Sequence, residues 1–202
     1  MIRILTDSAA DLTAAELNAP GVTVVPMTVT FMDGSSQEDD GTMTKDEFFA
    51  RLASDSKLPR TSQPSPAGFM QAYEGAAAAG DEVIVITIAQ KLSGTYQCAH
   101  LAAADVGLQA HIVDSEAASQ GEALLVREAV RLRDEEGLTA EEIAAVLEQF
   151  KKRVRIVAVV DSLKHLQKGG RLPAAVALVG GALGIKPVLA LQDGAIKLVD
   201  KG

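Results

Sequence analysis

The sequence predicts an α/β fold with a mostly parallel sheet flanked by helices. Short apolar runs rich in β-branched residues recur along the chain, and each is too short for a helix. Helical patterns lie between these runs, and strand–helix alternation is typical of a parallel sheet. Beyond Arg155 the chain becomes glycine-rich. We therefore place a domain boundary near Arg155, between residues 1–155 and residues 156–202.

Six segments are predicted as strands from these short apolar runs. They are Ile2–Thr6, Val22–Phe31, Val83–Ile88, His111–Val113, Ile156–Val160 and Ile185–Leu191. Pro26 inside the second run indicates an edge strand, because proline has no N–H to donate to a neighbouring strand. Asp33-Gly34, just after the same run, indicates a tight turn.

Helix starts are marked by capping residues. Thr44 with Glu47, and Thr139 with Glu142, have the spacing of capping boxes, and Ser65 opens a further helix. A long helical pattern covers roughly residues 116–135. After the second capping box, four apolar residues at spacing i, i+3, i+4, i+7 predict one buried stripe. These residues are Ile143, Val146, Leu147 and Phe150.

Composition narrows the class of protein. The chain has 202 residues, 48% of them hydrophobic, and a formal net charge of -8. An acidic chain argues against nucleic-acid binding and against attachment to anionic membranes. Cys98 is the single cysteine, which fits a reducing compartment. The longest apolar run, residues 174–185, is too short to span a membrane. We expect a cytoplasmic protein without stable membrane insertion.

Three strand-like runs end in the same dipeptide, Asp-Ser, at residues 7–8, 114–115 and 161–162. Ligands of parallel sheets bind beyond the carboxyl ends of the strands, so three aspartates there could hold a divalent cation. Asp and Ser are also ordinary N-cap residues of a following helix. Both interpretations stay open from the sequence.

Ser93-Gly94-Thr95 lies between a strand and a predicted helix. A helix start leaves backbone N–H groups unpaired and carries partial positive charge, and Gly94 permits close approach to the backbone. With a hydroxyl on each side, this turn is a candidate site for a carboxylate or phosphate. The alternative is that Ser93 or Thr95 simply caps the helix.

The segment LPRTSQPSP, residues 58–66, holds Thr61 and Ser62 on a loop with three prolines. Proline fixes φ and restricts the residue before it, so the loop is braced in an extended shape. Such a loop either holds polar groups ready for a ligand or serves as a rigid connector between two helices.

The chain carries little acid–base machinery. It has no GxSxG elbow, no HExxH and no paired-cysteine metal spacing, and Cys98 and His100 lie two apart on a predicted helix. These absences favour binding over catalysis, with no cofactor or metal expected. Lys168 and Arg171 form a basic spot in KHLQKGGRLP. This spot is either the cationic end of a helix or a docking surface for an acidic partner.

Several motifs together resemble the DegV family, over essentially the whole chain. They are TDSAADL at 6–12, TSQPSPAGF at 61–69, SGTYQCA at 93–99, DSEAASQGEA at 114–123, LKHLQKGGRL at 163–172 and GIKPVL at 184–189. The resemblance implies a protein that binds a long-chain fatty acid in a tunnel between two α/β lobes. Some members serve as the lipid-carrying subunit of a bacterial fatty acid kinase, and an ATP-dependent partner subunit then phosphorylates the carboxyl group.

Carried over residue by residue, the resemblance gives Thr61 and Ser93 as carboxylate ligands, with the Gly94 N–H beside them. Ser62 and Thr95 would flank this site, and Lys168 and Arg171 belong to the KGGR motif that we expect at the docking surface. The protein would then not be an enzyme by itself.

Two departures from the family pattern stand out. Family members usually continue well past KLVDKG, so the second lobe is expected to be C-terminally truncated and its strands to expose unpaired edges. Gly184 also stands where Asn is common before IKP. The alternative function is a metal-dependent phosphotransferase or phosphate-ester enzyme that uses the Ser93–Thr95 turn and an aspartate cluster.

Overall fold

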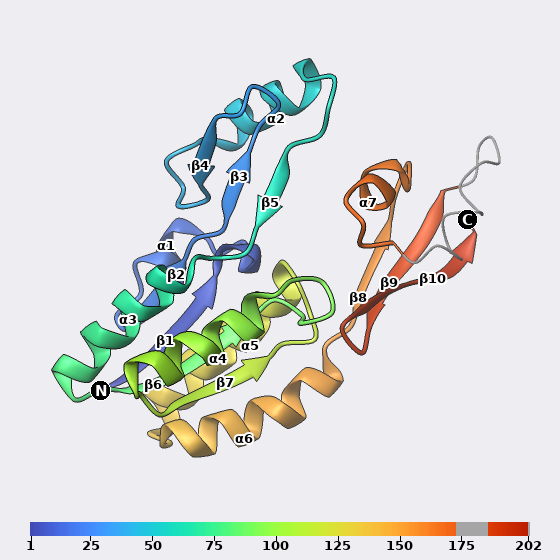
Figure 1. Ribbon diagram of the computed structural model, residues 1–202. Coiled ribbons are helices and arrows are strands. Elements are labelled where there is room, and N and C mark those ends of the chain that lie inside the picture. Colours follow the sequence, from blue (N-terminus) through green and yellow to red (C-terminus); the bar gives the residue numbers. More distant parts are fainter. Residues whose placement is uncertain (173–185, 202) are drawn as a thin grey trace.

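The computed structural model describes residues 1–172 and 186–201. A four-stranded parallel sheet forms the centre of the N-terminal lobe, with strand order β2-β1-β6-β7 (Figure 1). Its strands are β1 (Ile2–Asp7), β2 (Val22–Val25), β6 (Glu82–Thr87) and β7 (Ala110–Asp114). The predicted parallel α/β sheet is confirmed. The apolar run 174–185, which includes Gly184 and Ile185, lies outside the described residues.

Helices cover both faces of this sheet. Alternate side chains of a strand point to opposite faces, so Ile4 packs with α5 (Gln120–Arg131) and α6 (Ala140–Phe150). Its neighbour Leu5 packs on the other face with α3 (Pro66–Ala79) and α4 (Thr95–Val106). The strands are thus buried on both sides, and their carboxyl ends are held in one place by two helical layers (Figure 1).

The long helix expected over residues 116–135 is shorter at its start. Glu116 and Ser119 both have a φ of 52°, in the left-handed region, and a right-handed helix cannot pass through such residues. The helix therefore begins at Gln120, and after Arg131 it widens into a π-helical turn, Leu132–Glu136. The predicted stripe of α6 is also narrower than expected, because Val146 is 37% exposed.

The single run predicted over Val22–Phe31 is two strands in different sheets. The chain leaves the edge strand β2 at Pro26 and enters β3 (Thr28–Thr30). β3 pairs in antiparallel fashion with β4 (Ser36–Glu38) and β5 (Arg60–Ser62), in the order β4-β3-β5. We call this the small sheet. Helix α2 (Lys45–Ser54) lies beside it, and the rings of Phe31 and Phe48 are 6.3 Å apart.

The remaining short elements follow the same capping rules. Asp7 caps the 3-10 turn η1 (Ser8–Ala10), and Thr13 forms a capping box with Glu16 at α1 (Ala14–Leu17). The predicted boxes at Thr44 and Thr139 are both present. A 3-10 turn, η3 (Lys151–Arg153), follows α6 and leads into the second sheet.

The C-terminal part contains a separate antiparallel sheet of strand order β10-β9-β8. It comprises β8 (Ile156–Val159), helix α7 (Lys164–Lys168), β9 (Pro187–Gln192) and β10 (Ala195–Lys201). Its buried cluster is small, being built on Leu163, Leu172 and Leu189. On β8, Val157 is 64% exposed and Val159 is 65% exposed. Val157 and Val159 lie on one exposed face of β8, and in the described part of the chain β8 and β10 are the edge strands of this sheet.

Several contacts among the described residues join the C-terminal part to the N-terminal lobe. The Lys91 Nζ donates to the carbonyl oxygen of Asp193 at 2.7 Å, and the Arg171 Nε donates to the carbonyl oxygen of Leu92 at 3.2 Å. Gly121, at the start of α5, faces Ile156 so closely that an added Cβ would lie 2.3 Å from its Cδ1. Two of the contacts fall on the loop that precedes α4.

Candidate functional site

The start of α4 lacks a side-chain cap. Gly94 is the N-cap residue, and no side chain accepts a hydrogen bond from the first N–H groups of the helix. The hydroxyls of Ser93 and Thr95 instead bond to each other at 2.9 Å. The capping interpretation of this turn is therefore wrong, and among the described residues no side chain caps the N–H groups at the positive end of the helix.

The second hydroxyl-bearing turn ends the small sheet. Thr61 pairs with Val29 and Ser62 with Thr28 in the β3–β5 ladder, so the backbone at both positions is fixed. Both residues are exposed. Shortly afterwards, Ser65 caps α3 by accepting a hydrogen bond from the Gly68 N–H at 3.1 Å. The braced segment thus connects β5 to α3 and presents hydroxyls at the same time.

The two turns meet although they lie about thirty residues apart. A Cβ placed on Gly94 would lie 2.1 Å from the Gln63 Oε1, so the amide of Gln63 rests directly on the Gly94 backbone. The Cys98 thiol donates to the Pro64 carbonyl oxygen at 3.4 Å. The structure therefore brings two segments together at the start of α4. We call residues 61–63 the TSQ turn and residues 93–95 the SGT turn.

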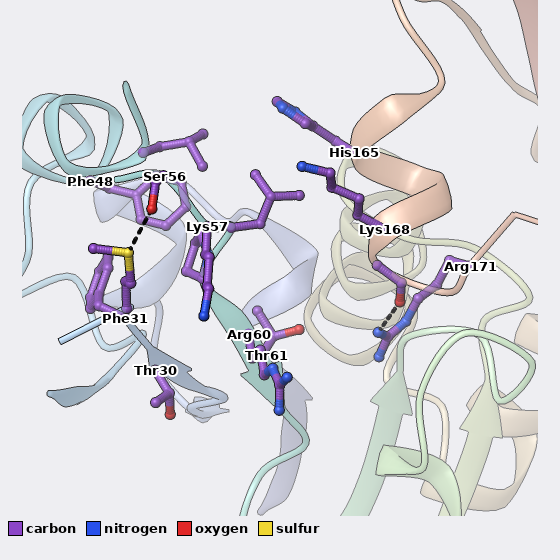
Figure 2. Close-up of a pocket in the computed structure, with 15 residues that line it drawn as sticks. Thr30, Phe31, Phe48, Ser56, Lys57, Arg60, Thr61, His165, Lys168 and Arg171 are labelled. Carbon is purple, nitrogen blue, oxygen red and sulfur yellow. Dashed lines mark hydrogen bonds between the residues drawn. The ribbon is translucent and has the colours of Figure 1, made fainter. Parts of the chain in front are cut away.

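Beside the two turns lies a pocket of about 990 Å³. Figure 2 shows its two sides: the small sheet with helix α2 carries Phe31, Phe48 and Thr61, and the region of α7 carries His165 and Lys168. The full lining is Thr30, Phe31, Met32, Phe48, Leu52, Ser56, Lys57, Leu58, Pro59, Arg60, Thr61, His165, Lys168, Gly169 and Arg171. Ser62, Ser93, Gly94 and Thr95 are not among these lining residues. The pocket spans both lobes.

The charge of this pocket is opposite to that of the chain. Lys57, Arg60, Lys168 and Arg171 line it, and no carboxylate belongs to its described lining. A cationic pocket in a chain of net charge -8 selects an anionic ligand or an acidic surface. The sequence interpretation found Lys168 and Arg171 but missed Lys57, Arg60 and His165.

Two of the missed residues had a signal in the sequence. Arg60 directly precedes Thr61 in the braced loop, and His165 lies three residues before Lys168, a spacing that places both on one helix face. Lys57 had no comparable signal, because only the folded chain brings its loop opposite α7 (Figure 2).

The basic stretch after α7 reaches the loop that leads into the SGT turn. The Arg171 Nη1 donates to the Gly169 carbonyl oxygen at 2.6 Å, and its Nε donates to the carbonyl oxygen of Leu92. Gly170 has a φ of 74°, a conformation that glycine adopts without strain, and it turns the chain back toward the N-terminal lobe. The guanidinium therefore contacts the residue that directly precedes Ser93.

The repeated aspartates accept hydrogen bonds from backbone N–H groups. Asp7 accepts from Ala9 at 3.0 Å and from Ile88 at 2.9 Å. Asp114 accepts from Gln90 at 3.2 Å and from Glu116 at 3.0 Å. Both aspartates thereby tie the loops after β1, β6 and β7 together.

The third aspartate, Asp161, pairs with Lys186 at 2.8 Å. In the part of the chain that the structure describes, no three His, Cys, Asp or Glu side chains are grouped to hold a metal ion. The Asp-Ser dipeptides are explained by hydrogen bonds and ion pairs within the protein.

One buried acidic pair lies beneath these loops. Burial raises the pKa of Asp7 to about 6, against an ordinary value of 3.8. Burial, together with the nearby charge of Asp7, raises the pKa of Glu122 well above its usual range. The Thr6 hydroxyl donates to the Glu122 Oε1 at 3.0 Å, while the Oε2 has no hydrogen-bond partner among the described residues. A protonated Glu122 is the form that this buried position favours.

Cys98 is not poised for nucleophilic chemistry. Its side chain is buried, and burial raises the pKa of the thiol, although a hydrogen bond from Gln63 acts in the opposite direction. A protonated thiol is a poor nucleophile. The arrangement at the two turns therefore offers hydroxyls, N–H groups and nearby cations, which suit anion binding.

The fold and the site define a class: a two-lobed α/β protein with a cationic pocket between its lobes. The sequence profile described as an uncharacterised protein of the DegV family matches residues 1–202. A DegV domain-containing protein of Caldanaerobacter subterraneus is 37% identical over 201 residues, covering 99% of this chain and 71% of the relative. The chain belongs to the DegV family.

Solved structures extend the comparison to ligands. A fatty-acid-binding DegV family protein from Thermus thermophilus superposes with a TM-score of 0.89 at 37% identity. A stearic-acid-binding protein from Eubacterium ventriosum also gives 0.89, at 33% identity. The fatty acid kinase B3 protein of Streptococcus pneumoniae, loaded with linoleic acid, gives 0.87 at 26% identity.

Each of these structures is longer than this chain. The match covers the whole of this chain, but 71% of the first two structures and 73% of the third. The chain therefore spans about seven tenths of the length of these structures. Within the described ranges, none of the helices has the length and apolar character needed to cross a membrane.

Proposed function

We propose that this protein binds a long-chain fatty acid between its two lobes and holds the carboxylate at the two hydroxyl-bearing turns. Thr61 and Ser93 donate from their hydroxyls, and the Gly94 N–H lies beside them. Ser62 and Thr95 flank the site, Thr95 by holding the Ser93 hydroxyl at 2.9 Å. The observation that carries this proposal is the contact of Gln63 with Gly94, which joins the two turns.

Charge and apolar surface support the same ligand. A carboxylate suits a pocket lined by four cations, and the apolar side chains of Phe31, Phe48 and Leu52 offer a surface for methylene groups. Burial contributes about 0.8 kcal/mol per CH₂, so roughly fifteen would contribute about 12 kcal/mol before the cost of association. Hydrogen bonds to a charged group add about 1.5–3 kcal/mol each. The tail therefore supplies affinity and the hydroxyls supply orientation.

The bound carboxylate would be presented to an ATP-dependent kinase subunit. Lys168 and Arg171 line the cationic pocket and offer docking contacts to an acidic partner surface. Similarity to the kinase B3 protein supports a kinase partner. In this scheme the protein is a lipid-carrying subunit, acts in the cytoplasm, and performs no chemistry alone.

The test is the lipid that the protein carries. Protein purified under native conditions is denatured and extracted, and the extract is analysed by mass spectrometry. We expect about one fatty acid per chain, and we expect delipidated protein to take up labelled oleate or palmitate. Clean protein that takes up neither label contradicts the proposal. Metal-dependent hydrolysis of phosphate esters by the protein alone would favour the alternative phosphotransferase.

A further inference from the structure

Gly94 is required for space and not for backbone freedom. Its φ is -76° and its ψ is 7°, values that any residue adopts. The constraint is the Gln63 side chain, whose Oε1, Cδ and Nε2 would lie 2.1, 3.1 and 3.5 Å from an added Cβ. The amide group of Gln63 therefore lies against the Gly94 Cα, at the point where α4 begins.

Gln63 is held in this position from a second direction. The residue that follows it, Pro64, is attached to Cys98, which lies one turn further along α4. The Cys98 thiol donates to the Pro64 carbonyl oxygen, so the loop after β5 is attached to the first turn of α4 at two successive residues. Two attachments prevent the TSQ turn from rotating about either one.

This attachment lies between the two hydroxyls of the proposed site. Thr61 is two residues before Gln63, and Ser93 is one residue before Gly94. The backbone at Thr61 and Ser62 is extended and paired with β3, which leaves little freedom to adjust. The side chain of Gln63 thus sets how far the Thr61 turn stands from the Ser93 turn.

We propose that Gln63 is a positioning residue for the anion site, and that Gly94 provides the backbone surface against which its amide packs. This inference rests on the proposed function, because the group that is positioned is the pair of hydroxyls that grips the carboxylate. The length of the side chain is the selected property. Asn is one methylene shorter and does not reach Gly94, whereas Glu reaches it but adds a negative charge next to the bound carboxylate.

A double-mutant cycle tests the inference in the full chain. The readout is the dissociation constant of parinaric acid, a fluorescent fatty acid, for wild type, Gln63→Ala, Gly94→Ala and the double variant. We expect each single variant to bind about tenfold more weakly, because each disturbs the spacing of the turns. The double variant should be no weaker than Gln63→Ala, because the methyl group added at position 94 then meets empty space. If the fold-losses in affinity of the two single variants multiply in the double variant, the inference is overturned.

Conservative variants separate positioning from folding. Gln63→Glu and Gln63→Asn should both weaken binding while the melting temperature stays within about 2 °C of wild type, since Gln63 is exposed. The matched control is Gln71→Ala, an exposed glutamine on α3, which should bind as wild type does. If wild type binds parinaric acid and Gln63→Ala binds equally well, this inference alone fails. If wild type does not bind fatty acid, the proposed function fails and this inference fails with it.

Discussion

Arg171 and Leu92 lie in different lobes and are joined by one hydrogen bond, from the Arg171 Nε to the Leu92 carbonyl oxygen at 3.2 Å. Leu92 directly precedes Ser93, so a basic residue of the second lobe reaches the backbone of the proposed carboxylate site. The same guanidinium lines the cationic pocket. The proposed carboxylate site is therefore complete only when the two lobes keep the relative position seen in the structure.

Replacing Arg171 should weaken the contact between the two lobes. Arg171→Lys keeps the charge but loses the branched guanidinium, or fork, that donates to the carbonyl oxygens of both Leu92 and Gly169. We expect about twofold to tenfold weaker fatty acid binding, because an exposed hydrogen bond is lost. Parinaric acid titration measures the effect. Arg153→Gln, a change of an exposed arginine outside the pocket, is the control. Equal affinity of Arg171→Lys and wild type would contradict the role of the fork.

Removing the ligand hydroxyls should weaken binding more strongly. We expect Ser93→Ala and Thr61→Ala each to raise the dissociation constant by about tenfold to a hundredfold, as for hydrogen bonds to a charged group. Ser93→Ala should also lower stability by about 1 kcal/mol, because the buried Thr95 hydroxyl loses its partner. Thr139→Ala is the control: it removes the cap of α6 at a cost of about 1 kcal/mol but should leave fatty acid affinity unchanged.

The buried acidic pair predicts how stability depends on pH. The folded pKa of Asp7, about 6, lies above its ordinary value of 3.8, so the folded state binds more protons between these values. Stability therefore falls as pH rises through this window, by about 1–3 kcal/mol, and Glu122 acts in the same direction. Urea unfolding between pH 4 and 9 measures this dependence.

The opposite trend should set in at lower pH. Hydrogen bonding from Arg127 lowers the pKa of Glu16 to about 2, and the N-terminal ammonium lowers the pKa of Asp81. The stability that these groups contribute is present above their ordinary pKa values and is lost as pH falls through the folded ones. We expect greatest stability at about pH 4–5, where the folded-state carboxylates of Glu16 and Asp81 are ionised and Asp7 is still largely protonated. Stability that rises steadily from pH 5 to 8 would contradict the assignment.

Neutralising Glu122 should stabilise the protein. Glu122→Gln keeps the Oε1 that accepts from Thr6 and replaces a buried ionisable group next to Asp7 with a neutral amide. We expect its melting temperature at pH 8 to exceed that of wild type by at least about 2 °C, which corresponds to about 1 kcal/mol in a chain of this size. The difference should shrink as pH falls, because the wild-type carboxyl becomes protonated. A lower melting temperature at pH 8 would show that the charged form is stabilised in the fold.

Tight packing at Gly121 should make the lobe junction sensitive to one methyl group. Gly121→Ala places a Cβ 2.3 Å from the Ile156 Cδ1 and 3.1 Å from the Ala117 Cβ. We expect a loss of about 1–3 kcal/mol, partly relieved by adding Ile156→Ala. Gly75→Ala is the matched control, since its nearest atom, the Arg3 Nη1, is 3.9 Å away. That change should stabilise α3 slightly, and thermal unfolding compares the three variants.

The sequence predicted the parallel sheet because its strands read as short runs rich in β-branched residues that alternate with helical patterns, most clearly the VIVI of β6. It did not predict the small sheet. Strands of three residues such as Thr28–Thr30 and Ser36–Glu38 are polar and too short for a periodic signal. The one apolar run that enters this sheet was extended through Pro26, where the chain in fact changes sheets.

The candidate site was proposed from the sequence by two routes. Local turn chemistry marked the Thr61 and Ser93 segments as polar turns, and only the resemblance to the DegV family joined them as ligands of one carboxylate. The contact of Gln63 with Gly94 and the position of Lys57 opposite α7 depend on long-range packing, which no local pattern encodes. The same holds for the pair of Asp7 and Glu122, whose members are far apart in sequence.

The small sheet carries Thr61, whereas Ser93 belongs to a loop of the parallel sheet. A ligand gripped by both residues is a non-covalent cross-link between two separately hydrogen-bonded units. Amide hydrogen exchange in β3 and β5 should therefore slow when lipid is bound, even though the acyl chain forms no bond with those amides.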